Sequence, residues 1–298
     1  MVVDTKFENL FLNVSIKAAL ASYYFVGKKN KNAADKAAVD AMRAELNKIN
    51  MKGKIVIGEG ELDEAPMLFI GEELGSAKDP ELDIAVDPLE GTNFAAYNLP
   101  GALSVISVAN KSDLFNAPET YMNKISANVK EAKVVDLDYS IKKNVYNLAD
   151  YKNKNPKDLT VCLLDRPRHK EIITELKNLN VNLKLITDGD VSGALLVTDS
   201  KYGVDMFLGI GGGPEGVLAA SALDTYNCFF QGRFIFDNES DKSRAKKMGI
   251  KDLEKKYNLN EIVTGDSIFC ATGITSGDLV SGIKVNNKEF LTDTLLTH

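Results

Sequence analysis

The apolar positions in the first part of the chain predict two helices and several short strands. In residues 35–50 the apolar side chains are spaced three and four apart on one face, which predicts an amphipathic helix with Asp35 at its start, and residues 8–26 are interpreted as another helix. The apolar run 55–57 predicts a strand that the acidic loop 58–66 cuts off. The other elements expected here are a helix with Pro66 in its first turn and Gly75 at its end, a strand ending at Asp87, and a strand at 102–109.

Later in the chain, apolar strand patterns alternate with helical patterns. Strands are expected at 159–165, 181–186 and 204–210, each followed by a helix, at 168–178, 190–198 and 215–223. Such alternation predicts a parallel sheet covered by helices. The polar stretch 150–158 contains Pro156 and has no periodicity, so it is the candidate linker between domains at 1–155 and 156–298. The remaining expected elements are strands at 226–236 and 266–272 and a hairpin at 281–296 that turns at Asn286-Asn287.

Composition and charge exclude several classes of protein. The 298 residues are 44% hydrophobic and 26% charged, which is typical of a folded protein large enough for two medium domains. No apolar run approaches twenty residues, and charges occur throughout the first thirty, so neither a membrane span nor a signal peptide is expected. The net charge of −6 argues against a nucleic-acid partner. The three cysteines form no CxxC pair, and we interpret them as reduced core thiols of a cytoplasmic protein.

Polar residues directly follow the expected strands of the second half. Ligands bind outside the carboxyl ends of the strands in an open parallel sheet, so these residues are the most informative about function. Arg166 and Arg168 follow the first strand, the turn 188–190 follows the second, and the glycine loop 211–216 follows the third. Arginine forks suit phosphate, and a glycine loop entering a helix suits an anion or a metal-bound ligand. Solvated charges, a capped turn and a tight turn are the plain structural alternatives.

The segment 83-DIAVDPLEGT-92 brings two carboxylates to the end of an apolar run. Pro88 is expected to fix a turn that folds Asp87 and Glu90 onto the same side. Two carboxylates this close repel each other unless a cation lies between them. Oxygen ligands without histidine favour Mg²⁺ or Mn²⁺ over zinc, and the chemistry predicted is metal-assisted attack of water on a phosphate ester. The acids that could complete the ligand set are Asp35, Glu59 and Glu215.

At these residues the chain resembles a known family. The segment 87-DPLEGT-92 resembles the signature of the lithium-sensitive, magnesium-dependent sugar and inositol phosphatases. The longer segment 55-IVIGEGELDEAPMLFIGEELG-75 is more specific and resembles class II fructose-1,6-bisphosphatase, the bacterial type. Further matching segments cover nearly the whole chain in order: 28-KKNKNAADKAAVDAMRAELN-47, 120-TYMNK-124, 166-RPRH-169, 188-DGD-190, 209-GIGGGPEGV-217 and 271-ATGITSGDL-279.

The resemblance implies a fold, an activity and a set of site residues. It implies an α/β protein built as a two-domain αβαβα layered sandwich, with the active site in the cleft between the domains. It also implies a cytoplasmic homo-oligomer, a dimer or tetramer, that uses Mg²⁺ or Mn²⁺ to hydrolyse the 1-phosphate of fructose 1,6-bisphosphate in gluconeogenesis. The implied metal ligands are Asp35, Glu59, Asp87, Glu90 and Glu215, and the implied catalytic residues are Thr92 and Asp63. The implied substrate-binding residues are Lys31, Glu90, Gly91, Thr92, Tyr121, Arg166, Pro167, Arg168, Asp188, Gly189 and Asp190.

The sequence departs from the family pattern at a few positions. Asn30 replaces an aspartate, Lys36 replaces a glycine beside Asp35, and Asn93 replaces a basic residue. None of these changes removes an implied ligand, but Lys36 is expected to alter metal affinity at Asp35. The segment 294–298 ends the chain where the family usually continues, which bears on the sheet edge there.

Three other functions stay open at this point. The first is a phosphatase for sedoheptulose 1,7-bisphosphate, for both bisphosphates or for inositol phosphate, although the loop 58-GEGELDEAP-66 argues against the inositol type. The second is a non-catalytic sugar-phosphate sensor, which we would expect to have lost a ligand or Thr92. The third is a dinucleotide-binding enzyme, but 209-GIGGGPEG-216 lacks the clean G-x-G-x-x-G spacing and the later acid of such sites.

Overall fold

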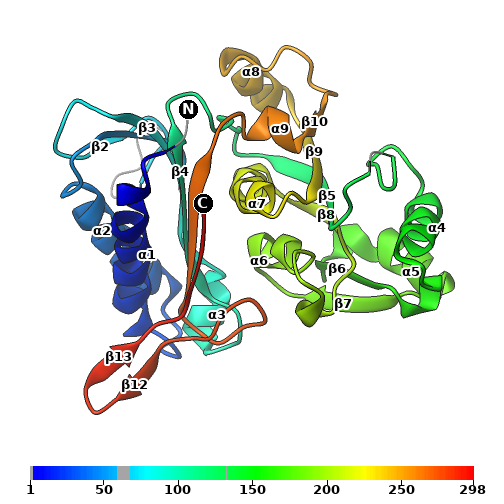
Figure 1. Cartoon of the computed structure of the whole chain (residues 1–298), viewed down its shortest axis with the longest axis horizontal. Coiled ribbons are helices and arrows are strands. Elements are labelled where there is room, and N and C mark those ends of the chain that lie inside the picture. The colour runs from blue at the N-terminus through cyan, green and yellow to red at the C-terminus, as the bar shows by residue number, and fades with distance from the viewer. Residues whose placement is uncertain (1–2, 59–67, 132) are drawn as a thin grey trace. The chain divides into compact units, whose positions relative to one another are not determined.

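The computed structural model describes residues 3–58, 68–131 and 133–298, which form two compact units (Figure 1). The first unit consists of Met1–Ala117 and Ile262–His298, and the second of Pro118–Glu261. The expected boundary between 155 and 156 therefore lies inside the second unit. The reason is that strand β5 and helix α4, which precede that boundary, belong to the sheet and the helical cover of the second unit.

The first unit contains a mixed sheet. Its described strands lie in the order β14-β11-β4-β3-β1-β2, with β3 parallel to β1 and antiparallel to β4, and β11 antiparallel to β4 and β14. The bounds are β1 Lys52–Ile57, β2 Glu73–Leu74, β3 Glu81–Glu90, β4 Leu103–Asn110, β11 Ser267–Gly273 and β14 Thr294–Thr297. Segments from both ends of the chain thus share one sheet.

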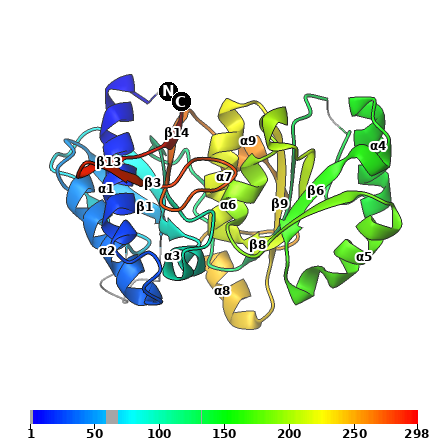
Figure 2. The ribbon, with the colours of Figure 1, turned by 90° about the horizontal axis from the view of Figure 1, so that it is seen from below.

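Two long helices cover one face of this sheet. Helices α1 (Glu8–Tyr23) and α2 (Lys31–Leu46) pack against each other and against β3, and α1 also packs against β4 and β11 (Figures 1 and 2). Buried side chains from helices and strands join there in one apolar core, among them Phe11, Met42 and Ile84. The smaller elements of this unit are η1 Thr5–Phe7, α3 Thr92–Tyr97, and the exposed ribbon β12 Lys284–Asn286 with β13 Glu289–Leu291.

The second unit also contains a mixed sheet, with its described strands in the order β10-β9-β5-β8-β6-β7. Strand β6 is parallel to β7 and β8, as the alternation predicted, whereas β5 is antiparallel to both β8 and β9. The expectation of a parallel sheet, made from three alternating strands, is therefore confirmed for β6, β7 and β8. Antiparallel strands complete the sheet, and two of them, β5 and β10, were not expected from the sequence. The bounds are β5 Tyr121–Ala127, β6 Thr160–Leu164, β7 Asn182–Ile186, β8 Met206–Gly212, β9 Phe229–Ile235 and β10 Lys256–Asn258.

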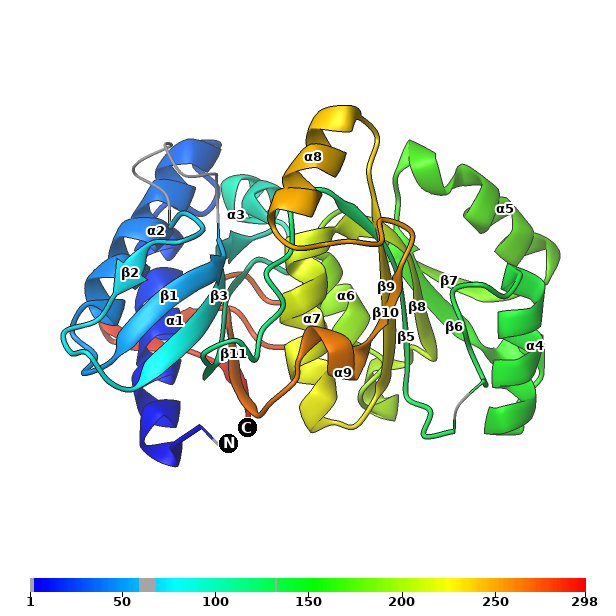
Figure 3. The same ribbon diagram turned by 90° about the horizontal axis from the view of Figure 1, so that it is seen from above.

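Helices cover both faces of the second sheet, and alternate residues of β5 show which face is which (Figure 3). Ile125 and Ala127 belong to the core beneath α4 and α5, whereas the Ser126 hydroxyl donates to the Ala194 carbonyl of α6. Lys124 therefore points to the α6 and α7 side, because it lies two residues from Ser126. The bounds are α4 Ile141–Lys152, α5 Lys170–Asn178, α6 Asp190–Leu195, α7 Gly213–Thr225, α8 Glu239–Lys247, α9 Leu259–Ile262, η2 Pro156–Asp158, η3 Pro167–His169 and η4 Ser200–Tyr202.

Three local expectations need correction. The helix expected to end at Gly75 is wrong over the described residues 68–75, where Glu73–Leu74 pairs with β1 as an edge strand. The candidate linker 150–158 is instead the end of α4 followed by η2, so it is ordered structure inside the second unit. Helix α2 begins at Lys31, where the side chain of Asn30 caps it, so Asp35 lies one turn inside the helix rather than at its start.

The remaining expected strands and helices are present, with bounds that differ by a few residues. The hairpin turns around Asn287 and Lys288, both with positive φ, one residue later than expected. Over the part of the chain that the structure describes, every helix is too short or too polar to span a bilayer. The α/β class is confirmed, and in each unit helices pack on a mixed sheet.

Candidate active site

A one-residue bulge near the end of β3 brings Asp87 and Glu90 to the same face of the first sheet. Asp87 lies opposite Val105 of β4 and Glu90 lies opposite Leu103, so three steps on β3 match two steps on β4. Residues two apart on a strand share a face, so the partners of Val105 and Leu103 share one as well. The expected proximity of the two acids thus comes from a bulge within the strand, and Pro88 lies in that bulge rather than in a turn.

The two acids lie on the face opposite to α1 and α2. Leu89, between them in the bulge, belongs to the apolar core under those helices, so Glu90 points the other way. Glu90 is 4% exposed and Asp87 is half-buried, and the Asp87 carboxylate accepts a hydrogen bond from the Leu89 N–H at 3.2 Å. Burial makes a carboxylate a stronger partner for a cation, because water no longer solvates its charge.

The chain turns at Gly91 and enters α3 at Thr92. Gly91 has φ of 78° and caps the helix, and a Cβ at this position would lie 2.7 Å from the Phe94 ring. Glycine is needed here because the left-handed conformation and the close ring both disfavour a side chain. Thr92, two residues after Glu90 in the sequence, is the first residue of α3 and is half-buried.

Helix α2 carries the two remaining described residues that were predicted for this part of the site. It packs against β3 and α3, and it holds Asp35, which is half-buried, and Lys31, which is exposed. Lys36, the departure from the family pattern, forms an exposed ion pair with Asp40 at 2.6 Å. Its ammonium is therefore held by a carboxylate one turn further along the helix. The predicted residues Glu59 and Asp63 lie outside the described residues.

In the second unit, Arg168 joins three predicted features. Its guanidinium lies over the Tyr121 ring, with its carbon 4.7 Å from the ring centroid. Its Nε and Nη2 donate to the Ile210 carbonyl at 3.0 and 2.9 Å. The arginine of the loop after β6 is thus fixed to Tyr121, the first residue of β5, and to the Ile210 carbonyl of β8, while its side chain stays exposed.

Arg166 and the turn 188–190 also meet. The Arg166 Nη2 lies 3.8 Å from Asp188 Oδ1, and both side chains are partly exposed. Gly189 has φ of 78° and precedes α6, so it reverses the chain between the two aspartates. Asp190 is the first residue of α6 and is buried, a position in which an acid interacts favourably with the helix dipole. The loops after β6 and β7 therefore converge, as predicted. Pro167, the first residue of η3, is exposed between the two arginines.

The structure adds Lys124, for which the sequence predicted no role. It lies in the middle of β5 and is 1% exposed. Its ammonium forms an ion pair with Asp190 and donates to the Gly212 carbonyl at 2.7 Å. The sequence did contain a signal for it, namely a lysine between Met122 and Ser126 on one face of a strand. That signal could be used only once the position of β5 in the sheet was known.

Glu215 occupies the first turn of α7, where Gly211 and Gly212 leave room for carboxylates. A Cβ at Gly212 would lie 1.8 Å from Glu215 Oε2, and one at Gly211 would lie 1.8 Å from Asp190 Oδ2. Burial raises the pKa of Glu215, and the charge of Asp190 raises it further, whereas the charge of Lys124 opposes the rise. A bound cation would stabilise the charged form of such a group.

His169 is the second residue to which the sequence assigned no role. It is fully buried, the Ile210 N–H donates to its Nε2 at 2.7 Å, and its Nδ1 therefore carries the proton that it donates to the Leu164 carbonyl, at 2.6 Å. The neutral imidazole ties the loop after β6 to β8. Burial lowers the pKa of His169, and the charge of Arg168 lowers it further.

The donor chemistry of these acids fits a hard divalent cation. Asp87 and Glu90 present carboxylate oxygens on one face, and Glu215 offers a third carboxylate in the second unit. Within the described ranges, no three histidine, cysteine or acidic side chains gather closely enough to hold an ion by themselves. Glu59, the remaining proposed ligand, is outside those ranges.

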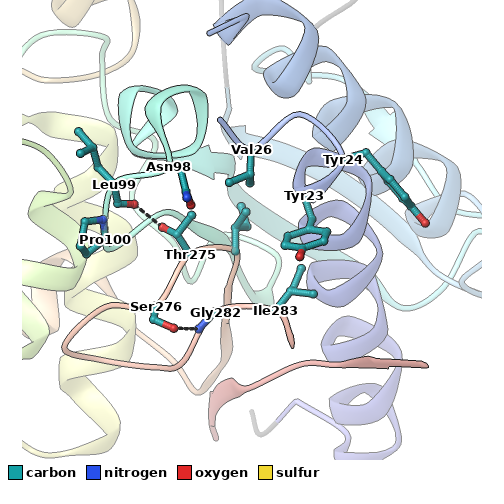
Figure 4. Close-up of a pocket in the computed structure, with 11 residues that line it drawn as sticks. Tyr23, Tyr24, Val26, Asn98, Leu99, Pro100, Thr275, Ser276, Gly282 and Ile283 are labelled. Carbon is teal, nitrogen blue, oxygen red and sulfur yellow. Dashed lines mark hydrogen bonds between the residues drawn. The ribbon is translucent and has the colours of Figure 1, made fainter. Parts of the chain in front are cut away.

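A pocket of about 670 Å³ lies in the first unit, between the end of α1 and the loops that follow α3 and β11 (Figure 4). The Thr275 hydroxyl donates there to the Leu99 carbonyl at 2.7 Å, and the Gly282 N–H donates to the Ser276 hydroxyl at 2.9 Å. None of the predicted site residues that the structure describes lines this pocket. Its polar groups hold the loops of the first unit together.

The predicted residues thus form a described group in each unit. In the first unit, Asp87, Glu90 and Thr92 follow one another at the end of β3, beside the helix that carries Asp35. In the second unit, direct contacts link the residues of three loops with β5, in the pairs Tyr121–Arg168, Arg166–Asp188 and Lys124–Asp190. Glu215 belongs to the second unit, whereas the other described candidate ligands belong to the first.

Comparison with known proteins identifies the family. A family model described as bacterial fructose-1,6-bisphosphatase, glpX-encoded, matches residues 6–298. The chain is 42% identical to a D-fructose 1,6-bisphosphatase class 2/sedoheptulose 1,7-bisphosphatase of Synechocystis sp., over 92% of this chain and 86% of the relative. It is 41% identical to the protein of the same description from Prochlorococcus marinus (strain AS9601), over 96% of this chain and 90% of the relative.

Two solved structures are similar over part of the chain. The extragenic suppressor protein suhB from Bartonella henselae is 12% identical, with a TM-score of 0.39 over 69% of this chain and 76% of that one. The inositol monophosphatase from Anabaena (Nostoc) sp. PCC 7120 is 15% identical, with a TM-score of 0.32 over 64% of this chain and 69% of that one. The assignment depends on the sequence matches, which span nearly the whole chain: it belongs to the family of bacterial class II fructose-1,6-bisphosphatases encoded by glpX.

Proposed function

We propose that this fructose-1,6-bisphosphatase removes the 1-phosphate of D-fructose 1,6-bisphosphate and also accepts sedoheptulose 1,7-bisphosphate. The observation that carries the proposal is the contact network of the second unit, in which Arg168 is held by Tyr121 and the Ile210 carbonyl and Arg166 lies 3.8 Å from Asp188. The names of the relatives from Synechocystis and Prochlorococcus, which include both bisphosphates, support the wider specificity. A longer sugar adds only hydroxyl groups, which the same kind of carboxylates can bind.

The second unit would hold the end of the substrate that does not react. The guanidinium groups of Arg166 and Arg168 suit a phosphate, because each presents a planar set of donors that pairs with two oxygens. The Tyr121 ring and the Ile210 carbonyl hold Arg168 in place before substrate arrives. Asp188 and Asp190 would accept hydrogen bonds from sugar hydroxyls. Binding at this remote end aligns the reacting phosphate.

The first unit would provide most of the metal ligands and the water-activating groups. The proposed ligands of Mg²⁺ or Mn²⁺ are Asp35, Glu59, Asp87, Glu90 and Glu215. When bound, the metal neutralises phosphate oxygens and lowers the pKa of a bound water. Thr92 would orient the attacking water through its hydroxyl, and Asp63 would accept the proton. The backbone of Gly91 and Thr92 and the side chain of Lys31 would contact the substrate phosphates.

Hydrolysis forms one bond to phosphorus and breaks another. The oriented water attacks phosphorus, the bond between phosphorus and the sugar oxygen breaks, and the sugar leaves as fructose 6-phosphate after taking up a proton. The role of the chain's own residues is to hold the phosphate, the water and the leaving oxygen in line.

A phosphate-release panel tests the proposal. The purified protein is assayed with fructose 1,6-bisphosphate, sedoheptulose 1,7-bisphosphate and inositol 1-phosphate, with Mg²⁺, with Mn²⁺ and with a chelator, and then with added Li⁺. We expect release from both sugar bisphosphates, little from inositol phosphate, none with chelator, and inhibition by Li⁺. Release from fructose bisphosphate alone would remove the second substrate. No release under any condition, with binding of the bisphosphate retained, would favour a sensor.

Two further attributes are part of the proposal. We expect the chain to act in the cytoplasm and to form a homo-oligomer, a dimer or tetramer, as the family resemblance implies. Light scattering of the eluted protein measures the mass directly, and a single-chain mass of 32.5 kDa would contradict the oligomer.

A further inference from the structure

Lys124 is a buried cation, and neighbouring glycines leave space for its side chain. Its side chain is 1% exposed in the middle of β5, on the face covered by α6 and α7. The position that a Cβ would take at Gly216 is 3.3 Å from the Lys124 Cδ, and that at Gly211 is 3.1 Å from its Nζ. Glycines of the segment 211–216 therefore leave the space through which this side chain passes.

The ammonium of Lys124 connects two loops of the candidate site. It pairs with Asp190, the first residue of α6, and donates to the carbonyl of Gly212 at 2.7 Å, directly before α7. The turn that follows β7 and the glycine loop that follows β8 are thus held by one side chain. Both loops carry residues of the proposed site, namely Asp188 and Asp190 in the first and Glu215 just after the second.

A stabilising role alone does not account for this pair. An apolar pair of similar volume fills such a space without removing two charges from water, and exchanges of this kind are often neutral or stabilising. The N-terminus of α7 also disfavours a cation and favours an anion. Lys124 therefore lies where the dipole of α7 disfavours its positive charge. It lies next to the Asp190 carboxylate, which the proposed function requires in a fixed position.

We infer that Lys124 is a positioning residue for the sugar substrate, which acts by fixing the Asp190 carboxylate. The inference deepens the proposed function and rests on it, because Asp190 is there the group that binds the sugar. Lys124 itself is too deeply buried to touch a ligand in solution, so its effect passes through Asp190.

A double-mutant cycle tests this inference. The variants are Lys124→Met, Asp190→Asn and the combination of both, with Lys177→Met, an exposed lysine of α5, as the matched control. Two measurements are made on each: KM and kcat for fructose 1,6-bisphosphate, and the affinity for fructose 6-phosphate by calorimetry. The second measurement needs no turnover, so it separates the inference from the proposed function.

We expect Lys124→Met to raise KM and to weaken fructose 6-phosphate binding by about ten- to a hundredfold, with a smaller change in kcat. In the Asp190→Asn background the same change is expected to add less than about threefold, since the group through which it acts is already altered. The control is expected to match the wild type. Where Lys124→Met alone does not fold, the comparison of Asp190→Asn with the double variant, which removes both charges together, carries the test.

Two results would overturn the inference. One is a Lys124→Met protein that binds fructose 6-phosphate within about twofold of the wild type. The other is an effect of Lys124→Met that is as large with Asn at 190 as with Asp, since Lys124 would then act independently of Asp190. A wild type that binds fructose 6-phosphate but releases no phosphate from the bisphosphate would instead refute the proposed function, while the binding arm still decides the role of Lys124.

Discussion

At the scale of single residues, the candidate site depends on positions where a side chain would be in the way. Gly91 lets β3 turn into α3 directly after Glu90, and Gly211 and Gly212 leave room for the carboxylates of Asp190 and Glu215. Because these glycines carry no side chain, backbone and carboxylate can lie close together. Their substitution should therefore change the local geometry before it changes any contact of the substrate.

Replacement of Gly91 by alanine should destabilise the protein by more than the cost of placing alanine in a left-handed conformation. The conformation costs about 1–2 kcal/mol, and the clash of the new Cβ with Phe94, 2.7 Å away, adds about 1–3 kcal/mol. Gly71→Ala is the matched control, because Gly71 also has positive φ but no atom within 4 Å of the new Cβ. Urea unfolding midpoints measure both, and an equal loss in the two variants would contradict the role of the ring.

Replacement of Thr92 by alanine should lower kcat by about 10²–10⁴-fold, because the hydroxyl that we propose to orient the attacking water is lost. Thr92→Ser keeps the hydroxyl and is expected to retain most of the activity. The midpoint of thermal unfolding should change little in both, since Thr92 is only half-buried and is the first residue of a short helix. A Thr92→Ala protein with near wild-type phosphate release would show that the assigned role is wrong.

Residue identities could be predicted from the sequence where a strand end and a turn leave few alternatives. The acids of 87–92 and the polar residues after β6 and β7 were found in this way. The bulge that brings Asp87 and Glu90 together was not, since it depends on pairing with β4, which no local pattern records. Lys124 was missed for the same reason, because its partner Asp190 is far away along the chain.

At the scale of elements, His169 fixes the loop between β6 and α5 to strand β8. The ring lies against Gly209, accepts the Ile210 N–H and donates to the Leu164 carbonyl, so both ring nitrogens have assigned partners. The positive charges of Arg168 and Arg166 both disfavour a second proton on the ring. Protonation would place a donor at Nε2 opposite the donor of Ile210 and break that bond.

The stability of the protein should therefore fall as the pH decreases below about 6.5, the usual pKa of histidine. The unfolded chain takes up a proton there, whereas folded His169 stays neutral to lower pH, so acid favours unfolding. His169→Gln is expected to reduce the slope of unfolding free energy against pH between about 7 and 5. The matched control is His298→Gln at the other histidine. An unchanged slope in His169→Gln would contradict this account.

Elements could be predicted from the sequence where periodicity is strong, and less well where pairing decides. The alternating strands and helices from β6 to α7 were predicted, because each carries its own apolar pattern. Strand β2, with two residues at a sheet edge, has no such pattern and was expected to be helix. The antiparallel direction of β5 follows from its position between β8 and β9, which depends on the fold of the whole unit.

At the scale of the whole molecule, the second unit is an insertion within the first. The chain leaves the first unit after Ala117 and returns at Ile262, and these crossings are neighbours, since the Phe115 N–H donates to the Ile262 carbonyl at 2.9 Å. A polar stretch at 150–158 suggested a single linker, because composition cannot show that a sheet is completed by a distant segment.

The fragment 118–261 is expected to fold alone, since it contains its own sheet and its own apolar core. Fragment 1–117 is the contrasting control, because it lacks β11 and β14 and leaves β4 unpaired on one side. Urea unfolding followed by circular dichroism should show a cooperative transition for the first fragment and none for the second. A gradual loss of signal in fragment 118–261 would contradict this division.

The insertion also sets an order of events during protein synthesis. The ribosome completes β4 well before β11, with Asn110 and Ser267 separated by about 150 residues, which at about 5–20 residues per second takes roughly 8–30 s. Throughout that time β4 presents unpaired backbone groups along an apolar strand, a surface prone to pairing with other chains. The second unit is made without interruption and can fold meanwhile. The nascent chain is thus vulnerable to aggregation until β11 has left the ribosome and can pair with β4.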